Sequence, residues 1–422
     1  MRRYPAWKPI AFSILLTLCV PAGEAAAQTN FEVHRAINIA RWFTWPRYEK
    51  APKTGILWPP YTNVPAPPSE SDLRRLHDAG FDTVRLPVDP APFMVFKGEQ
   101  REAVYRMVLD AIRKIQAADL KVIVDLHPNS RHPAWGQHAV IAGLDAPAFT
   151  AYSDAVEDMA RRLTPFGTKH VALELMNEPR LKCQGGDQQR WQEMLSRMIR
   201  RARAGSAELT LVVTGACVSS ADGLMALDPG KLRDRNLIYT FHFYDPFSFT
   251  HQGAQFIPWP DKYLDEVPWP AGARPIGRSM ELIAQNVDAA PKLDVFAREK
   301  ARTGAEHNLQ KFYASHAGPE TIEKKFSEVS EWAKQYRIPG RQIFIGEFGV
   351  LRKEPDKPGA LCEDRMRWLR DVRTSADRHD FSWGYFSYDG PFALVDSDDD
   401  RRLDQPTLAS LGLKHDESRC PR

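Results

Sequence analysis

The stretch VALELMNE (Val171–Glu178) is a short apolar run that ends in two polar residues. Runs of this kind are typical of strands buried on both faces of a parallel sheet. Seven similar runs lie along the chain, at 35–42, 83–89, 121–127, 209–216, 237–244, 342–349 and 381–388. The sequence therefore predicts eight strands.

Helical patterns separate most of these runs. Residues 103–118 carry apolar side chains at spacings of three and four, and Pro147 suits the first turn of a helix over 147–163. Other helices are expected at 69–80, 188–203, 322–336 and 364–376. Strands that alternate with helices predict an α/β fold, a single (β/α)8 TIM barrel. An open doubly wound sheet is the alternative, but it usually has fewer strands, and no G-x-G-x-x-G follows any of these.

Two connections are long, 43–68 after the first strand and 245–341 after the sixth. Long loops in compact domains are usually functional, and in a barrel the loops after strands form the active face. The chain has 11 Trp and 33 Pro, and both residue types are frequent in these loops. We expect some of the following to bind substrate and the others to anchor loops: Trp42, Trp45, Trp135, Trp259 and Trp269.

The first 27 residues have the pattern of a secretory signal peptide. A basic start precedes the apolar run 11–20, and small residues at Ala25 and Ala27 suit cleavage near Ala27. We therefore expect a secreted or periplasmic protein with one catalytic barrel domain over 28–422. No other segment is apolar enough to cross a membrane, and a net charge of +3 is too small for a nucleic-acid-binding surface.

Polar residues near strand ends are the candidate catalytic groups, because barrel enzymes place their chemistry there. Glu178 and Glu347 follow the fourth and seventh strands. Glycoside hydrolysis uses two such carboxyl groups, one as acid and one to attack or to activate water. The other candidates at strand ends are Arg85, His127, Asn177, His242, Tyr244 and Trp383.

The motif 175–179 (LMNEP), followed by 345–349 (IGEFG), resembles glycoside hydrolase family 5. The family's other marks occur in order: VRLP at 84–87, DLH at 125–127 and FHFY at 241–244. The resemblance extends over about residues 31–413. It implies a retaining glycosidase in which Glu178 is the acid/base and Glu347 is the nucleophile.

The resemblance also implies roles for the neighbouring residues. Asn177 would bind the sugar 2-hydroxyl, and His127 would contact the central sugar. Arg85 and Tyr244 would orient Glu347 and lower its pKa. His242 would help Glu178 to stay protonated near neutral pH. Retention implies that the two carboxyl groups lie about 5–5.5 Å apart.

One departure concerns the sugar platform on strand eight. Family members commonly have a second Trp where the run WGYF (383–386) has Phe386, so either Trp383 or Phe386 is the platform. His251, in the loop after strand six, either lines the cleft or orders the loop.

The predicted mature chain retains four cysteines, which allow three pairings. Because strands four and five are neighbours in a barrel, we favour Cys183–Cys217, together with Cys362–Cys420 over the C-terminal tail. Free thiols are the alternative.

Together these features predict an exported, monomeric, cellulase-like endo-β-glucanase that acts on a polysaccharide or oligosaccharide without metal or cofactor. The alternatives within this chemistry are a β-mannanase, a β-1,3-glucanase and an exo-β-glucosidase. A non-catalytic polysaccharide-binding protein is the alternative from another class. A metal-dependent hydrolase would need a His-x-His on strand one, and an esterase would need G-x-S-x-G; the sequence has neither.

Overall fold

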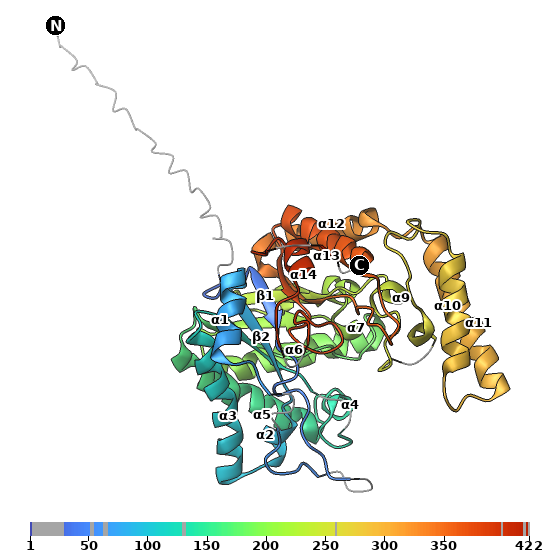
Figure 1. The fold of residues 1–422 in the computed structure, drawn as a ribbon. Coiled ribbons are helices and arrows are strands. Elements are labelled where there is room, and N and C mark those ends of the chain that lie inside the picture. Colours follow the sequence, from blue (N-terminus) through green and yellow to red (C-terminus); the bar gives the residue numbers. More distant parts are fainter. Residues whose placement is uncertain are drawn as a thin grey trace.

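Eight parallel strands form a closed barrel in which each strand pairs with the next and β8 pairs with β1 (Figure 1). The computed structural model describes residues 1, 29–50, 55–61, 66–128, 132–257, 260–397, 400–416 and 419–420. The strands are β1 (Arg35–Asn38), β2 (Thr83–Val88), β3 (Lys121–Leu126), β4 (Val171–Glu174), β5 (Thr210–Thr214), β6 (Leu237–His242), β7 (Ile343–Phe348) and β8 (Ser382–Tyr385). The predicted (β/α)8 barrel is confirmed. The expected signal peptide, apart from Met1, lies outside the described residues.

Helices surround the barrel. The cap expected at the first helix is present: the Ser69 hydroxyl accepts the backbone N–H of Asp72, and Gly80 ends the helix with a φ of 107°. The helices are α1 (Glu70–Ala79), α2 (Ala91–Val95), α3 (Gly98–Gln116), α4 (Gln137–Val140), α5 (Pro147–Leu163), α6 (Gly185–Gly205), α7 (Ala216–Ser219), α8 (Ala221–Met225), α9 (Phe247–Thr250), α10 (Gly277–Ala289), α11 (Val295–Ala314), α12 (Pro319–Gln335), α13 (Cys362–Arg378) and α14 (Gln405–Ser410). No helix in the described ranges is long and apolar enough to cross a membrane.

Apolar side chains fill both sides of the strands. A small cluster includes residues from β1, β3, β4, β5, β6 and β7, and the larger cluster joins the strands to the surrounding helices. The members of the small cluster are Phe31, Val33, Ala36, Ile123, Ala172, Val212, Ile238 and Phe344. Burial on both faces explains why the strands are continuous apolar runs in the sequence.

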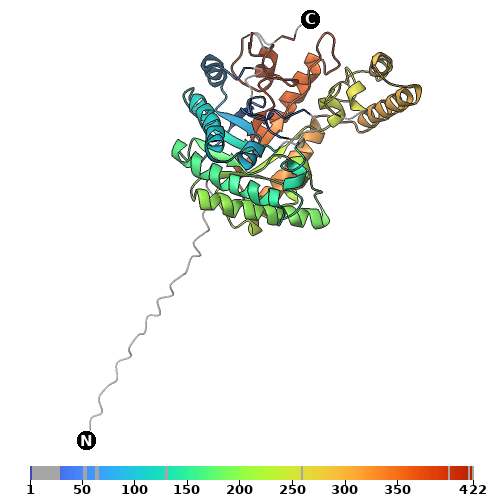
Figure 2. The same ribbon diagram turned by 90° about the horizontal axis from the view of Figure 1, so that it is seen from below.

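The long connection between β6 and β7 is mostly helical. It contains α9, α10, α11 and α12, and the α10–α11 pair projects from the side of the barrel (Figure 2). Trp269, one of the possible substrate platforms in this connection, is fully buried, and its indole N–H donates to Asp371 at 2.7 Å. It therefore anchors the connection, whereas Trp259 lies outside the described residues.

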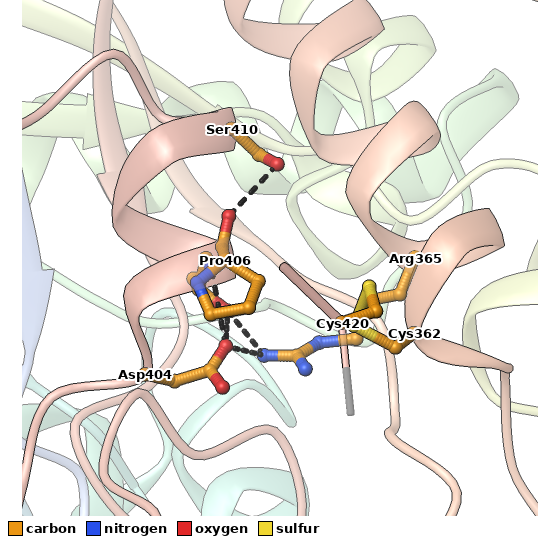
Figure 3. The surroundings of a disulfide bond; sticks show 7 residues. Cys362, Arg365, Asp404, Pro406, Ser410 and Cys420 are labelled. Atoms are coloured by element: carbon orange, nitrogen blue, oxygen red, sulfur yellow. Dashed lines mark hydrogen bonds and ion pairs between the residues drawn. A yellow bond between two sulfur atoms is a disulfide. The ribbon is translucent and has the colours of Figure 1, made fainter. Parts of the chain in front are cut away.

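Both favoured disulfides are present. Cys183 pairs with Cys217 across the connections that follow β4 and β5, with the Cα atoms 5.2 Å apart. Cys362, the first residue of α13, pairs with Cys420 near the C-terminus, with a Cα separation of 5.7 Å (Figure 3). Beside this bond, the buried Arg365 donates to the Thr407 hydroxyl at 2.6 Å. The C-terminal disulfide thus ties the tail to α13.

Candidate active site

The centre of the site is Arg85 on β2, which is fully buried. Its Nε and one Nη2 proton donate to the two carboxylate oxygens of Glu174 at 2.7 and 2.8 Å. Nη1 donates to Glu347 at 2.7 Å and to Asn38 at 2.9 Å, and Nη2 also donates to Asn177 at 2.9 Å. All five N–H groups of the guanidinium are therefore used.

Glu347 is directed towards the site by an irregularity between β6 and β7. Phe241 pairs with Ile345, but His242 pairs with Glu347, so Gly346 is an extra residue in β7. Bulges of this kind redirect a side chain next to an active site. Glycine is needed here because a Cβ would lie 3.3 Å from the His242 ring.

Both carboxylate oxygens of Glu347 have strong partners. Oε1 accepts from Arg85, and Oε2 accepts from the Tyr244 hydroxyl at 2.9 Å. Burial and the charge of Glu347 raise the pKa of Tyr244 well above its usual value, so this phenol stays a hydrogen-bond donor. The Glu347 carboxylate is thus held in one orientation.

Glu178 lies on the other side of His242. Its Oε1 is 2.9 Å from His242 Nδ1, and the same nitrogen is 3.5 Å from Glu347 Oε2. One carboxylate oxygen of Glu178 and one of Glu347 lie within 4.8 Å of each other. The Glu178 side chain is 24% exposed against 6% for Glu347, so Glu178 is the more accessible carboxylate.

The protonation of this pair differs from the sequence-based expectation. Burial raises the pKa of Glu178, but the hydrogen bond and charge of His242 outweigh it and bring the pKa below its usual value. Burial lowers the pKa of His242, but the charge of Glu347 and the hydrogen bond to Glu178 raise it overall. One proton is therefore shared by the pair and rests on His242.

His127 and Asn177 form a second connected group. His127 Nδ1 is 2.8 Å from Asp125, and its Nε2 is 3.2 Å from the Asn177 amide nitrogen. Burial lowers the pKa of His127, but the Asp125 charge outweighs it and raises the pKa overall. The Asp125 carboxylate also lies 3.0 Å from Arg85, which links this group to Glu347.

The two platform candidates on strand eight lie on different faces. Trp383 is 2% exposed, packs edge-on against Phe81 and Phe348, and lines a separate hollow of about 460 Å³ at the amino ends of the strands. Its placement as a substrate-binding residue is therefore corrected. Phe386 is partly exposed and packs on Phe392 together with Tyr244, next to the catalytic carboxylates.

The other aromatic candidates separate into anchors and exposed rings. His251 is 7% exposed and is stacked on Phe247 at 4.0 Å, and burial lowers its pKa to about 3, so it is a neutral ring behind Tyr244. Trp42 is buried, Trp135 is partly buried and Trp45 is 53% exposed.

Five residues of the site escaped the sequence reasoning. Asn38, Asp125 and Glu174 are fully buried polar residues inside otherwise apolar strand runs. Buried charges in such runs need partners, and that signal was available. Gln137 and Ser219, which bond the backbone of Glu178, have no comparable signal.

Within the described part of the chain, one group of three side chains has the spacing of metal ligands. It consists of Glu178, His242 and Glu347, whose nearest atoms lie within 4.8 Å of one another. These atoms already bond one another or Tyr244. The arrangement suits proton transfer between two carboxylates.

The comparisons with known proteins agree with this geometry. Residues 41–390 match the family model described as cellulase (glycosyl hydrolase family 5). The protein belongs to this family and is a glycoside hydrolase, which decides against the alternative of a non-catalytic binding protein.

Endoglucanase C of Acetivibrio thermocellus is 25% identical over 76% of this chain and 83% of its own length. Endoglucanase 3 of Fibrobacter succinogenes is 22% identical over 78% of this chain, which spans only 47% of that relative. Among solved structures, Thermotoga maritima Cel5A in complex with mannotriose has a TM-score of 0.63 at 20% identity. That match covers 90% of this chain and 98% of the other.

Proposed function

We propose that the protein is an exported, monomeric endo-β-1,4-glucanase that cleaves its substrate with retention of configuration. The observation that carries the mechanism is the pair of carboxylate oxygens within 4.8 Å of each other, from Glu178 and Glu347. Retaining enzymes hold these groups about 5–5.5 Å apart, and inverting enzymes need roughly 6.5–9.5 Å to admit water. We assign residues 1–27 to a signal peptide and 28–422 to the catalytic barrel.

In the first step Glu347 attacks the anomeric carbon while Glu178 protonates the leaving glycosidic oxygen, giving a glycosyl ester and a free sugar end. The charge of Glu347, which favours protonated His242, disappears as the ester forms. The pair then releases its proton through Glu178 when the leaving group needs it. In the second step ionised Glu178 removes a proton from water, which attacks the same carbon and frees Glu347.

The remaining residues bind the sugar. Asn177 donates to the 2-hydroxyl, because its carbonyl oxygen is already taken by Arg85 and its amide nitrogen is the free end of that bond. His127 contacts the same sugar, and Phe386 is the platform under it. A half-exposed Trp45 suits a sugar-binding position further along the cleft.

β-Mannan is the second candidate substrate, since a structural neighbour was solved with mannotriose and Phe386 departs from the usual platform. Exo action and β-1,3-glucan belong to the same test. Purified protein is incubated with carboxymethylcellulose, β-mannan and β-1,3-glucan, and the products are sized.

Glu178→Gln and Glu347→Gln are assayed on the best polymer beside the wild type. We expect each to lose at least about a hundredfold in rate, the lower range for acid–base catalysis. Nuclear magnetic resonance of the first products should show the β-anomer. Unchanged activity in both variants, or an α-anomer first, would refute the proposal.

A further inference from the structure

Glu178 has an unusual backbone conformation. Its φ is 41°, in the left-handed region that residues with a Cβ rarely adopt. It lies beyond the end of β4 at Glu174, so the ladder of the barrel does not fix it. Such a conformation persists only where the surroundings impose it.

Two side chains hold this peptide from opposite sides. The Gln137 amide, on α4 after β3, donates to the carbonyl oxygens of Asn177 at 3.1 Å and of Glu178 at 2.8 Å. The Ser219 hydroxyl, in the connection after β5, accepts the N–H of Glu178 at 3.2 Å. Gln137 is 3% exposed and Ser219 is fully buried, so water does not compete well for either bond.

Ser219 reaches Glu178 through a strained turn. Cys217, Val218 and Ser219 have φ values of 55°, 59° and 56°, three consecutive left-handed residues without a glycine. A β-branched residue is a genuine outlier there, and Val218 is 44% exposed, so core packing does not explain it. A Cβ on Gly215 would lie 1.9 Å from the carbonyl oxygen of Gly223, so the turn closes only with glycine there.

The turn is tied to the segment that directly follows Glu178. The N–H of Cys217 donates to Leu181 at 2.8 Å, and the N–H of Val218 donates to Pro179 at 3.1 Å. The disulfide between Cys183 and Cys217 closes the same connection covalently. Strain, hydrogen bonds and disulfide thus converge on one result, the placement of the Ser219 hydroxyl.

We propose that Gln137 and Ser219 are positioning residues for the acid/base Glu178, and that the Cys183–Cys217 disulfide holds Ser219 in place for this purpose. The inference rests on the proposed role of Glu178. It predicts that losing either residue impairs proton transfer by Glu178 and leaves the attack by Glu347 intact.

Leaving groups of different acidity separate these two effects. Aryl β-cellobiosides are used, or the matching aryl glycosides if the polymer panel selects another glycan. Dinitrophenolate leaves without a proton, whereas phenol needs the acid. With Glu178→Ala, kcat/KM for the dinitrophenyl substrate should stay near wild type and that for the phenyl substrate should fall. Azide should restore kcat, because it attacks the glycosyl ester without a base.

Ser219→Ala should lower kcat/KM for the phenyl substrate about fivefold to tenfold, the effect of one hydrogen bond, and that for the dinitrophenyl substrate less than about twofold. Gln137→Ala and the Cys183→Ser/Cys217→Ser double variant should show the same selectivity. Ser219→Gly, which tolerates the left-handed backbone, guards against misfolding of the alanine variant.

Ser153→Ala and Gln192→Ala are matched controls, since each removes a buried polar side chain with bonds far from the site. Both should leave the ratio of the two substrates unchanged. If Glu178→Ala loses both substrates equally and azide does not rescue it, the proposed function fails. If Glu178→Ala behaves as expected but the Ser219 and Gln137 variants lower both substrates equally, or neither, the inference alone is overturned.

Discussion

Replacing Arg85 with lysine should destabilise the protein although the charge is kept. The guanidinium directs five N–H groups at five acceptors on Glu174, Glu347, Asn38 and Asn177. A lysine ammonium has three donors, so at least two buried acceptors lose their partner. Each loss costs roughly 1–3 kcal/mol when a buried group is left unsatisfied. We therefore expect Arg85→Lys to lower the free energy of unfolding by about 2–4 kcal/mol.

Thermal and urea unfolding at neutral pH measure this change. At roughly 2 °C per kcal/mol, the upper end for a chain of this size, Tm should fall by about 4–8 °C. Arg365→Lys is the control, because Arg365 is also buried but has one short hydrogen bond, to Thr407 at 2.6 Å, and an acidic partner, Asp404, only at 3.5 Å. A Tm within about one degree of wild type for Arg85→Lys, or an equal loss in the control, would refute the reasoning.

Three further predictions concern the pH dependence, the platform and the tail. In His242→Asn a carboxyl group, Glu178, replaces an imidazolium with raised pKa as the proton carrier, so the alkaline limb of kcat/KM should move to lower pH; an unchanged limb contradicts this. Phe386→Ala should lower kcat/KM about tenfold through lost apolar contact, whereas Trp383→Phe should lower Tm and leave KM unchanged; steady-state kinetics and melting decide. Cys420→Ser opens a disulfide that spans 58 residues and should lower unfolding free energy by about 2–4 kcal/mol in urea titration, with activity retained.

The barrel was predictable because each strand is a run of apolar residues, and burial on both faces leaves such runs unbroken. The ends of strands were harder. The runs 35–42 and 171–178 contain strands that end at Asn38 and Glu174, because the chain then turns over the barrel mouth to place its functional groups.

Much of the catalytic constellation was also visible, since Glu178 and Glu347 are charged residues at the ends of buried strands. The platform was decidable in principle. Side chains alternate along a strand, so Trp383 and Phe386, three residues apart, point to opposite faces, and only one can face the cleft. The protonation of Glu178 was not decidable, because it depends on a distance of 2.9 Å to a histidine from another strand.

The closure of the barrel has a consequence for how the protein is made. Arg35 of β1 pairs with Trp383 of β8, so the first strand waits for its second neighbour until nearly the whole chain has left the ribosome. Contacts this remote in sequence form slowly. Arg85, Asp125 and Glu174 come together through β2, β3 and β4 well before β7 supplies Glu347. A half-made chain thus already holds the buried cation and two of its counter-ions, and the ability to cut glycan arrives only with the last quarter of synthesis.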